Sequence, residues 1–146
     1  MGSEISLFIS WAPLWHSDDP KYAVLAGDAE RLRRQNQAIE AGRRIWESFL
    51  LQNMGEEINF DGASGRAKVP ADRAGELDEI RERYGSCLGG GDVALGVGLK
   101  LDEADMALKL AVRRGGQVVF YTDEVPKELE AKPEDGELSK ADPQAQ

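Results

Sequence analysis

The spacing of apolar residues predicts a strand followed by a long helix. Residues 5–9 (ISLFI) are apolar and β-prone and are followed by Pro13, which is typical of a first strand. From about Tyr22 to Met54 the pattern is helical. Large apolar residues recur there every seven positions, at Leu25, Leu32, Ile39 and Trp46. Because the stretch contains Gly27 and Gly42, it predicts either one bent helix or two helices.

A hairpin and a second helix come next. The stretches 57–60 and 66–70 read as strands, and Gly62 and Gly65 between them are expected to supply the positive φ angles of a tight turn. A helix is predicted from Ala71 to Tyr84. Its apolar positions follow helical spacing: Leu77, Ile80 and Tyr84.

The next strand has one bulky face and one nearly bare face. Its bulky positions are Val93, Leu95, Val97 and Leu99, and they alternate with Ala94, Gly96 and Gly98. A face without side chains allows another element to pack very closely. A third helix is then predicted, with Asp102 as its cap and Gly115 as its stop, before a last strand at 117–121.

The element order is therefore β-α-β-β-α-β-α-β. With the final α–β pair taken as an appendage, this is the split βαβ of the ferredoxin-like α+β fold, with a mixed sheet and helices on one face. We expect residues 1–125 to form one domain. Residues 126–146 are acidic and contain proline, and they predict a tail that is disordered unless a partner orders it.

Charge and hydropathy exclude several classes of protein. The 146-residue chain has a net charge of -9, which argues against general nucleic-acid binding through a basic face. No apolar run approaches the roughly 20 residues of a membrane span. The first residues, 1–4, lack the order of a signal peptide. We therefore expect a cytoplasmic or virion-associated protein. Cys87 and His16 are single, so neither a disulfide within the chain nor a compact zinc site is expected.

Two stretches resemble a known family. Residues 104–118 (ADMALKLAVRRGGQV) resemble the closing signature of GGDEF-type nucleotide cyclases, in which an Ala-Asp-x-Ala-Leu helix runs through Ala-Lys to a glycine and a final strand. Residues 93–98 (VALGVG) resemble the strand before it. The small size and the junction at 99–102 are closer to the minimal CRISPR polymerases, which are single palm domains. The resemblance covers about residues 5–121 and implies a cyclase palm.

The resemblance also implies a metal site that this sequence lacks. Such palms hold two divalent metals and a nucleoside triphosphate. The family has an Asp after its first strand, where this chain has residues 10–12 (SWA), and two acids in the hairpin turn, where it has Ala63 and Ser64. The family's lysine of the Ala-Lys pair falls at Val112. Residues 89–92 (GGGD) match part of the motif in letters, and they are an alternative position for the turn.

Candidate ligand and interface residues remain. Four basic residues are candidates for binding a residual phosphate ligand: Arg66, Lys109, Arg113 and Arg114. A solvated charged face is the alternative for them. Asp61, with Asn59 or Asp18, is the remaining candidate for a single metal. Residues 11–15 (WAPLW) predict an unusually aromatic loop, which has three open interpretations: filling of the family's nucleotide pocket, an interface anchor, or stacking on a base. Its interface candidates are Trp11, Leu14 and Trp15.

The sequence thus predicts a non-catalytic palm, without catalytic residues, metal or cofactor, that acts by binding a protein or a nucleotide signal, or by self-assembly. A viral structural or accessory protein fits this prediction. The rival is an active cyclase that uses Mg²⁺ with ATP or GTP to make a cyclic di- or oligonucleotide. A third possibility is a regulatory domain that binds a nucleotide without turning it over.

Overall fold

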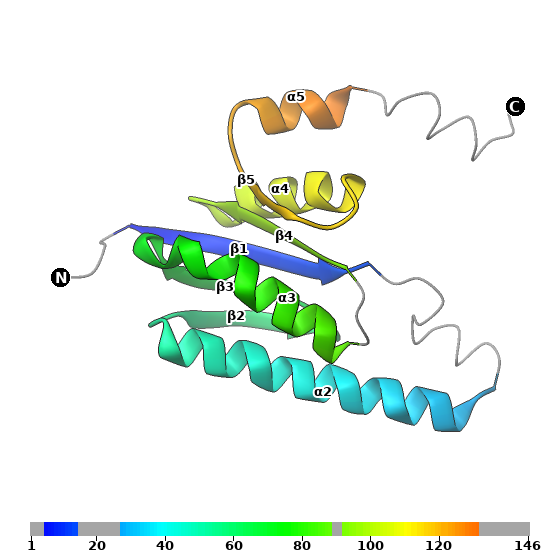
Figure 1. Ribbon diagram of the computed structural model, residues 1–146. Coiled ribbons are helices and arrows are strands. Elements are labelled where there is room, and N and C mark those ends of the chain that lie inside the picture. The colour runs from blue at the N-terminus through cyan, green and yellow to red at the C-terminus, as the bar shows by residue number, and fades with distance from the viewer. Residues whose placement is uncertain (1–4, 15–26, 89–91, 132–146) are drawn as a thin grey trace, which may run out of the picture.

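A computed structural model describes residues 5–14, 27–88 and 92–131 and contains a five-stranded sheet (Figure 1). The strands are β1 (Ser6–Pro13), β2 (Glu56–Asp61), β3 (Ser64–Pro70), β4 (Val93–Gly98) and β5 (Val118–Phe120). Their order across the sheet is β2-β3-β1-β4-β5. The β4–β5 pair is parallel and the other pairs are antiparallel, which confirms a mixed sheet in an α+β fold.

Within the described residues, four helical segments lie between the strands and a further helix follows the last strand. They are α2 (Ala29–Gln52), η1 (Ala71–Glu76), α3 (Leu77–Cys87), α4 (Leu101–Arg113) and α5 (Glu124–Glu130). Helices α2 and α3 lie together on one face of the sheet (Figure 1). Within the described part of the chain, no helix is long and apolar enough to cross a membrane.

The main core lies between the sheet and the α2–α3 layer. Alternate residues of β1, β3 and β4 point into it, including Ile9, Val69 and Leu95. At its centre the rings of Trp11 and Trp46 stack, with centroids 3.7 Å apart and planes 8° from parallel. The alternation predicted for the strand that contains Val93, Leu95 and Val97 is thereby confirmed.

Helix α4 lies on the opposite face, so the expectation that all helices cover one face is wrong. The cause is the bare side of β4, where a Cβ added to Gly96 would lie 2.2 Å from Ala104 O and Leu108 N. The backbone of α4 therefore packs directly on the backbone of β4. The prediction that something packs closely on this bare face is confirmed.

Several local predictions need correction. From Ala29 onward α2 is a single helix, capped by the Asp28 side chain, which accepts a hydrogen bond from Arg31 N at 2.9 Å. Gly62 does turn the hairpin with φ +64°, but Gly65 lies inside β3, where its missing side chain leaves room for the Trp11 ring. Helix α4 begins at Leu101, so Asp102 lies in its first turn and is not its cap.

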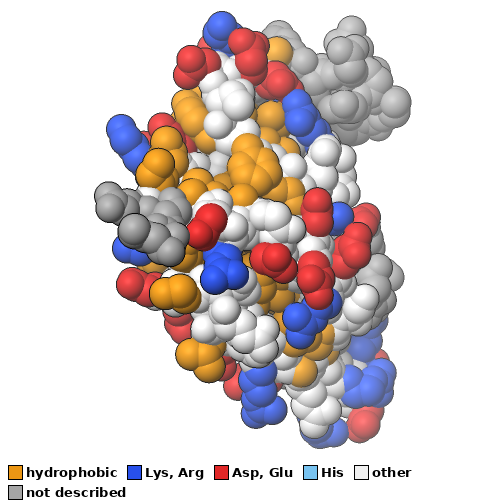
Figure 2. Space-filling view, turned by 60° about the vertical axis from the view of Figure 1, so that its left-hand side comes forward, with side chains coloured by type: hydrophobic (Ala, Val, Ile, Leu, Met, Phe, Trp, Pro, Cys, Tyr) orange, Lys and Arg blue, Asp and Glu red, His pale blue; other side chains and the backbone are white. Residues whose placement is uncertain are grey.

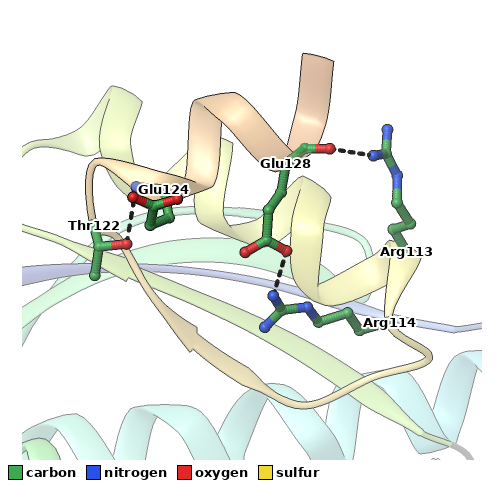
Figure 3. Close-up of polar contacts among 5 residues, drawn as sticks. All are labelled: Arg113, Arg114, Thr122, Glu124 and Glu128. Carbon is green, nitrogen blue, oxygen red and sulfur yellow. Dashed lines mark hydrogen bonds and ion pairs between the residues drawn. The ribbon is translucent and has the colours of Figure 1, made fainter. Parts of the chain in front are cut away.

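The C-terminal boundary also differs from the prediction. Residues 126–130, expected in the tail, belong to α5, and Val125 of this helix is buried. Helix α5 packs on α4, where Arg113 and Arg114 contact Glu128 (Figure 3). Residues 132–146 lie outside the described residues, so the prediction of a tail stays a prediction for that part of the chain.

Candidate functional site

A cleft of about 350 Å³ opens where β1 ends beside the β2–β3 turn, on the α4 side of the sheet. It forms there because β1 and β3 are antiparallel, with Trp11 paired to Gly65, so the turn lies next to the last residues of β1. Helix α4 supplies the other wall. The polar side chains around the cleft include Ser10, Asn59, Asp61, Arg66, Asp105 and Lys109.

Asp105 forms hydrogen bonds that link the three elements around the cleft, α4, β1 and β3. Its Oδ1 accepts a hydrogen bond from Ser10 Oγ at 2.8 Å and one from Arg66 Nε at 2.9 Å. Ser10 comes from β1, Arg66 from β3 and Asp105 from α4. The ion pair is partly exposed, so its contribution to stability is on the order of 1 kcal/mol or less. Its main consequence is positional, because the Asp105 carboxylate is held between Ser10 of β1 and Arg66 of β3.

The turn between β2 and β3 is hydrogen-bonded to helix α3. Ala63 is buried, and its carbonyl oxygen accepts a hydrogen bond from the Tyr84 hydroxyl on α3. Burial raises the pKa of the Tyr84 phenol above its ordinary range, because the ionised form would lose its hydration. The first of the two turn positions that carry acids in the family is thus occupied by a small side chain packed into the core.

The structure brings only two of the four basic candidates to the cleft. Arg66 and Lys109 line it. Arg113 instead donates to Glu128 O at 2.9 Å, and Arg114 pairs with the Glu128 carboxylate, so both contact α5 (Figure 3). Val112 is exposed, and it is not among the residues that line the cleft. Lys109, one helical turn earlier, is the lysine beside the cleft.

The three interface candidates, Trp11, Leu14 and Trp15, also differ in where they lie. Trp11 is fully buried against Trp46, so it cannot anchor an interface, and that expectation is corrected for this residue. The cause is its position on the α2–α3 side of β1, opposite the side chain of Ser10. Leu14 is partly buried, and its backbone N–H donates to Asp92 O at 2.8 Å. Trp15, His16 and Asp18 lie outside the described residues.

The alternative position for the turn does not match the hairpin. Strands β2 and β3 are joined at Asp61 and Ser64, so the turn that meets β1 is the one around Gly62. Asp92 instead stands immediately before β4. Residues 89–91 of the GGGD stretch lie outside the described residues.

The side chains around the cleft do not fit a two-metal site. Divalent cations such as Mg²⁺ bind several oxygen ligands, chiefly carboxylates. Asp61 and Asp105 are the carboxylates among the described residues that line the cleft, and Arg66 already pairs with Asp105. Nowhere in the described ranges do three or more Asp, Glu, His or Cys side chains gather so that they could hold a metal.

Comparison with solved structures identifies the fold. The chain is similar to the GGDEF domain of PA1120 (TpbB or YfiN) from Pseudomonas aeruginosa, in a truncated form that comprises only this domain. The TM-score is 0.60 at 13% identity, over 87% of this chain and 83% of that chain. Neither the protein-family models nor the curated proteins gave a match. The fold is therefore that of a GGDEF-like palm, as the sequence resemblance implied.

Proposed function

We propose that this chain is a non-catalytic palm domain that acts by binding a protein partner or by assembly. The observation that supports this is the hydrogen bonding of Asp105, whose Oδ1 accepts from both Arg66 and Ser10. A carboxylate in that arrangement is neutralised by a cation and has one oxygen occupied. It is poorly placed to serve as a metal ligand.

The chemistry of the reaction explains why this matters. Phosphoryl transfer in such a palm relies on positioning and on charge stabilisation by metal ions, which the protein holds through carboxylates. Here a serine hydroxyl stands on β1 and a buried alanine stands in the turn, followed by Ser64. Neither group replaces the charge of a carboxylate. We accordingly propose that the chain uses neither Mg²⁺ nor a nucleoside triphosphate as a cofactor.

Turnover assays test this proposal directly. The full chain is incubated with Mg²⁺ or Mn²⁺ and with ATP or GTP, and the products are separated by chromatography and mass spectrometry. We expect no cyclic nucleotide and no pyrophosphate. Metal-dependent turnover that is lost in both Asp61→Asn and Asp105→Asn would contradict the proposal and favour the active cyclase.

A residual ligand site is a second candidate function. Lys109 and Arg66 both line the cleft, and since Arg66 pairs with Asp105, Lys109 is the cation on which a phosphate group would chiefly depend. The test is a thermal shift with ATP or GTP in the absence of metal, comparing the natural chain with Lys109→Gln. Stabilisation that depends on Lys109 would support a regulatory, nucleotide-binding domain. An equal response from Arg114→Gln, which lies against α5, would indicate non-specific binding.

A further inference from the structure

The two edges of the sheet differ sharply in charge. Half of the β2 edge strand is acidic, with Glu56, Glu57 and Asp61, and a bulge interrupts it between Glu57 and Asn59. Charges and bulges are devices that prevent an edge strand from pairing with another chain. The β5 edge has neither, because residues 115–122 (GGQVVFYT) carry no charge and β5 itself contains two valines and a phenylalanine.

Backbone groups of β5 point to this open edge. Gln117 O accepts from Leu95 N at 3.0 Å, and Tyr121 N donates to Val97 O at 2.7 Å, so these residues direct their groups to β4. Successive residues of a strand direct their N–H and C=O groups to opposite sides. Val118 and Phe120 therefore direct theirs away from β4, toward the edge that has no other strand among the described residues.

Exposed apolar side chains accompany these backbone groups. Phe120 pairs with Val97 and is 47% exposed, and Leu99, just beyond the end of β4, is 60% exposed. The end of the molecule where β4 and β5 finish shows hydrophobic side chains gathered in its upper half (Figure 2). Helix α5 packs mainly against α4, on the other side of the sheet from Phe120. The Phe120 side is thus left uncovered by α5.

We propose that a second copy of this chain pairs with β5 in antiparallel orientation, about a two-fold axis at Val119. Val118 of each copy would then lie across from Phe120 of the other and exchange two backbone hydrogen bonds with it. This proposal assigns a surface to the assembly role proposed above. It rests on that assembly role and not on the absence of catalysis.

A second copy suits this edge better than the chain's own unplaced C-terminal segment. An antiparallel strand edge is complementary to itself, so a two-fold pairing satisfies every outward group between 118 and 120. Two chains of net charge -9 repel each other least where neither carries charge, as at 115–122. Residues 132–146, in contrast, contain Pro133 and Pro143 and four acidic residues, which make a poor strand.

Side chains must supply much of the affinity. Strand β5 has three residues, so the pairing adds four backbone hydrogen bonds across the axis. The exposed rings of the two Phe120 residues and the two Leu99 side chains would be covered together with Val118. Aromatic residues at the centre of an interface typically carry most of its binding energy. Phe120 is therefore the position whose loss separates the copies.

The experiment compares the two edges in the full chain. Sedimentation is measured over a range of concentrations for the natural chain, for Phe120→Lys on β5 and for Ile58→Lys on β2, where Ile58 is 41% exposed. We expect a dimer that Phe120→Lys weakens by about tenfold or more in dissociation constant. Ile58→Lys should leave the dimer unchanged. A chain that is monomeric at all concentrations, or a dimer weakened equally by both variants, would overturn the proposal.

Hydrogen exchange of the natural chain supplies a test that needs no variant. The amides of Val118 and Phe120 should become protected as concentration rises through the dimer range, while the Ile58 amide stays unaffected. A dimer in which both β5 amides still exchange freely uses another surface and contradicts the proposal. Failure here leaves the non-catalytic proposal standing, since that proposal is tested by turnover.

Discussion

The two faces of the sheet are packed by different means. On the α2–α3 face, large side chains fill the space, with Trp11 stacked on Trp46 and surrounded by Phe60, Phe49 and Tyr84. On the α4 face, glycine allows a helix backbone to rest on a strand backbone. The first face is stabilised by the area of apolar surface that it buries. The second is stabilised by close contact between two backbones, which the missing side chains of β4 allow. The cleft lies on the second face, where α4 leaves part of β1 and β3 uncovered.

Removal of a large side chain from the filled face should have the largest effect. Trp46→Ala should lower the free energy of unfolding by about 3–5 kcal/mol, because it removes the stacking partner of Trp11 and leaves a cavity. Urea unfolding monitored by circular dichroism measures this change. Leu51→Ala, on the same helix but 83% exposed, is the control and should change stability by about 0.5 kcal/mol or less. Equal losses in the two variants would contradict the packing described for this face.

Addition of a single methyl group should damage the close-packed face. Gly96→Ala places a Cβ 2.2 Å from two backbone atoms of α4, so the helix must shift, at a cost of about 1–3 kcal/mol. Gly75→Ala is the matched control, because nothing lies within 4 Å of its added Cβ. That control should be neutral or slightly stabilising. The same urea titration compares them, and a stable Gly96→Ala chain would show that α4 does not rest on β4.

The smallest loss of stability is expected from removal of the hydrogen bond between Tyr84 on the α2–α3 face and the hairpin turn. Tyr84→Phe removes the hydrogen bond to Ala63 O and should cost about 1 kcal/mol near neutral pH. Burial raises the folded-state pKa of Tyr84 above its unfolded value, so the unfolded chain loses this proton first as pH rises. The natural chain should therefore lose stability above about pH 10, and Tyr84→Phe should lose less. Parallel alkaline slopes in the two chains would contradict this assignment.

The sequence predicted much of the fold because periodicity reports which residues face a core. The strand with bulky Val93, Leu95 and Val97 was predicted with its bare side, yet the side of the sheet on which α4 lies depends on the three-dimensional path of the chain. Gly65 was expected to turn the hairpin, since a glycine needed for positive φ and one needed for close approach look identical in a sequence.

At the candidate site, the sequence shows where residues differ from the family pattern, but it does not show the contacts that those residues make. The substitutions at Ser10, Ala63 and Ser64 were visible by comparison with the family pattern. The bond from Asp105 to Ser10 and Arg66 was not, because it joins residues 95 and 39 positions apart, and neither spacing has a local signature. Arg113 and Arg114 were grouped with Arg66 by charge, and the tertiary contact with α5 separates them.

The bond between Ser10 and Asp105 also restricts how this chain can evolve. A Ser10→Asp substitution would put a second carboxylate where a hydroxyl now donates to Asp105, so two acceptors would face each other beside a single arginine. With Ala63 buried in the turn, such a mutant would lose a hydrogen bond before it gained a complete metal site. Under the non-catalytic proposal, a gain of catalysis would therefore require several substitutions together, because an acid at position 10 alone disturbs the contacts of Asp105.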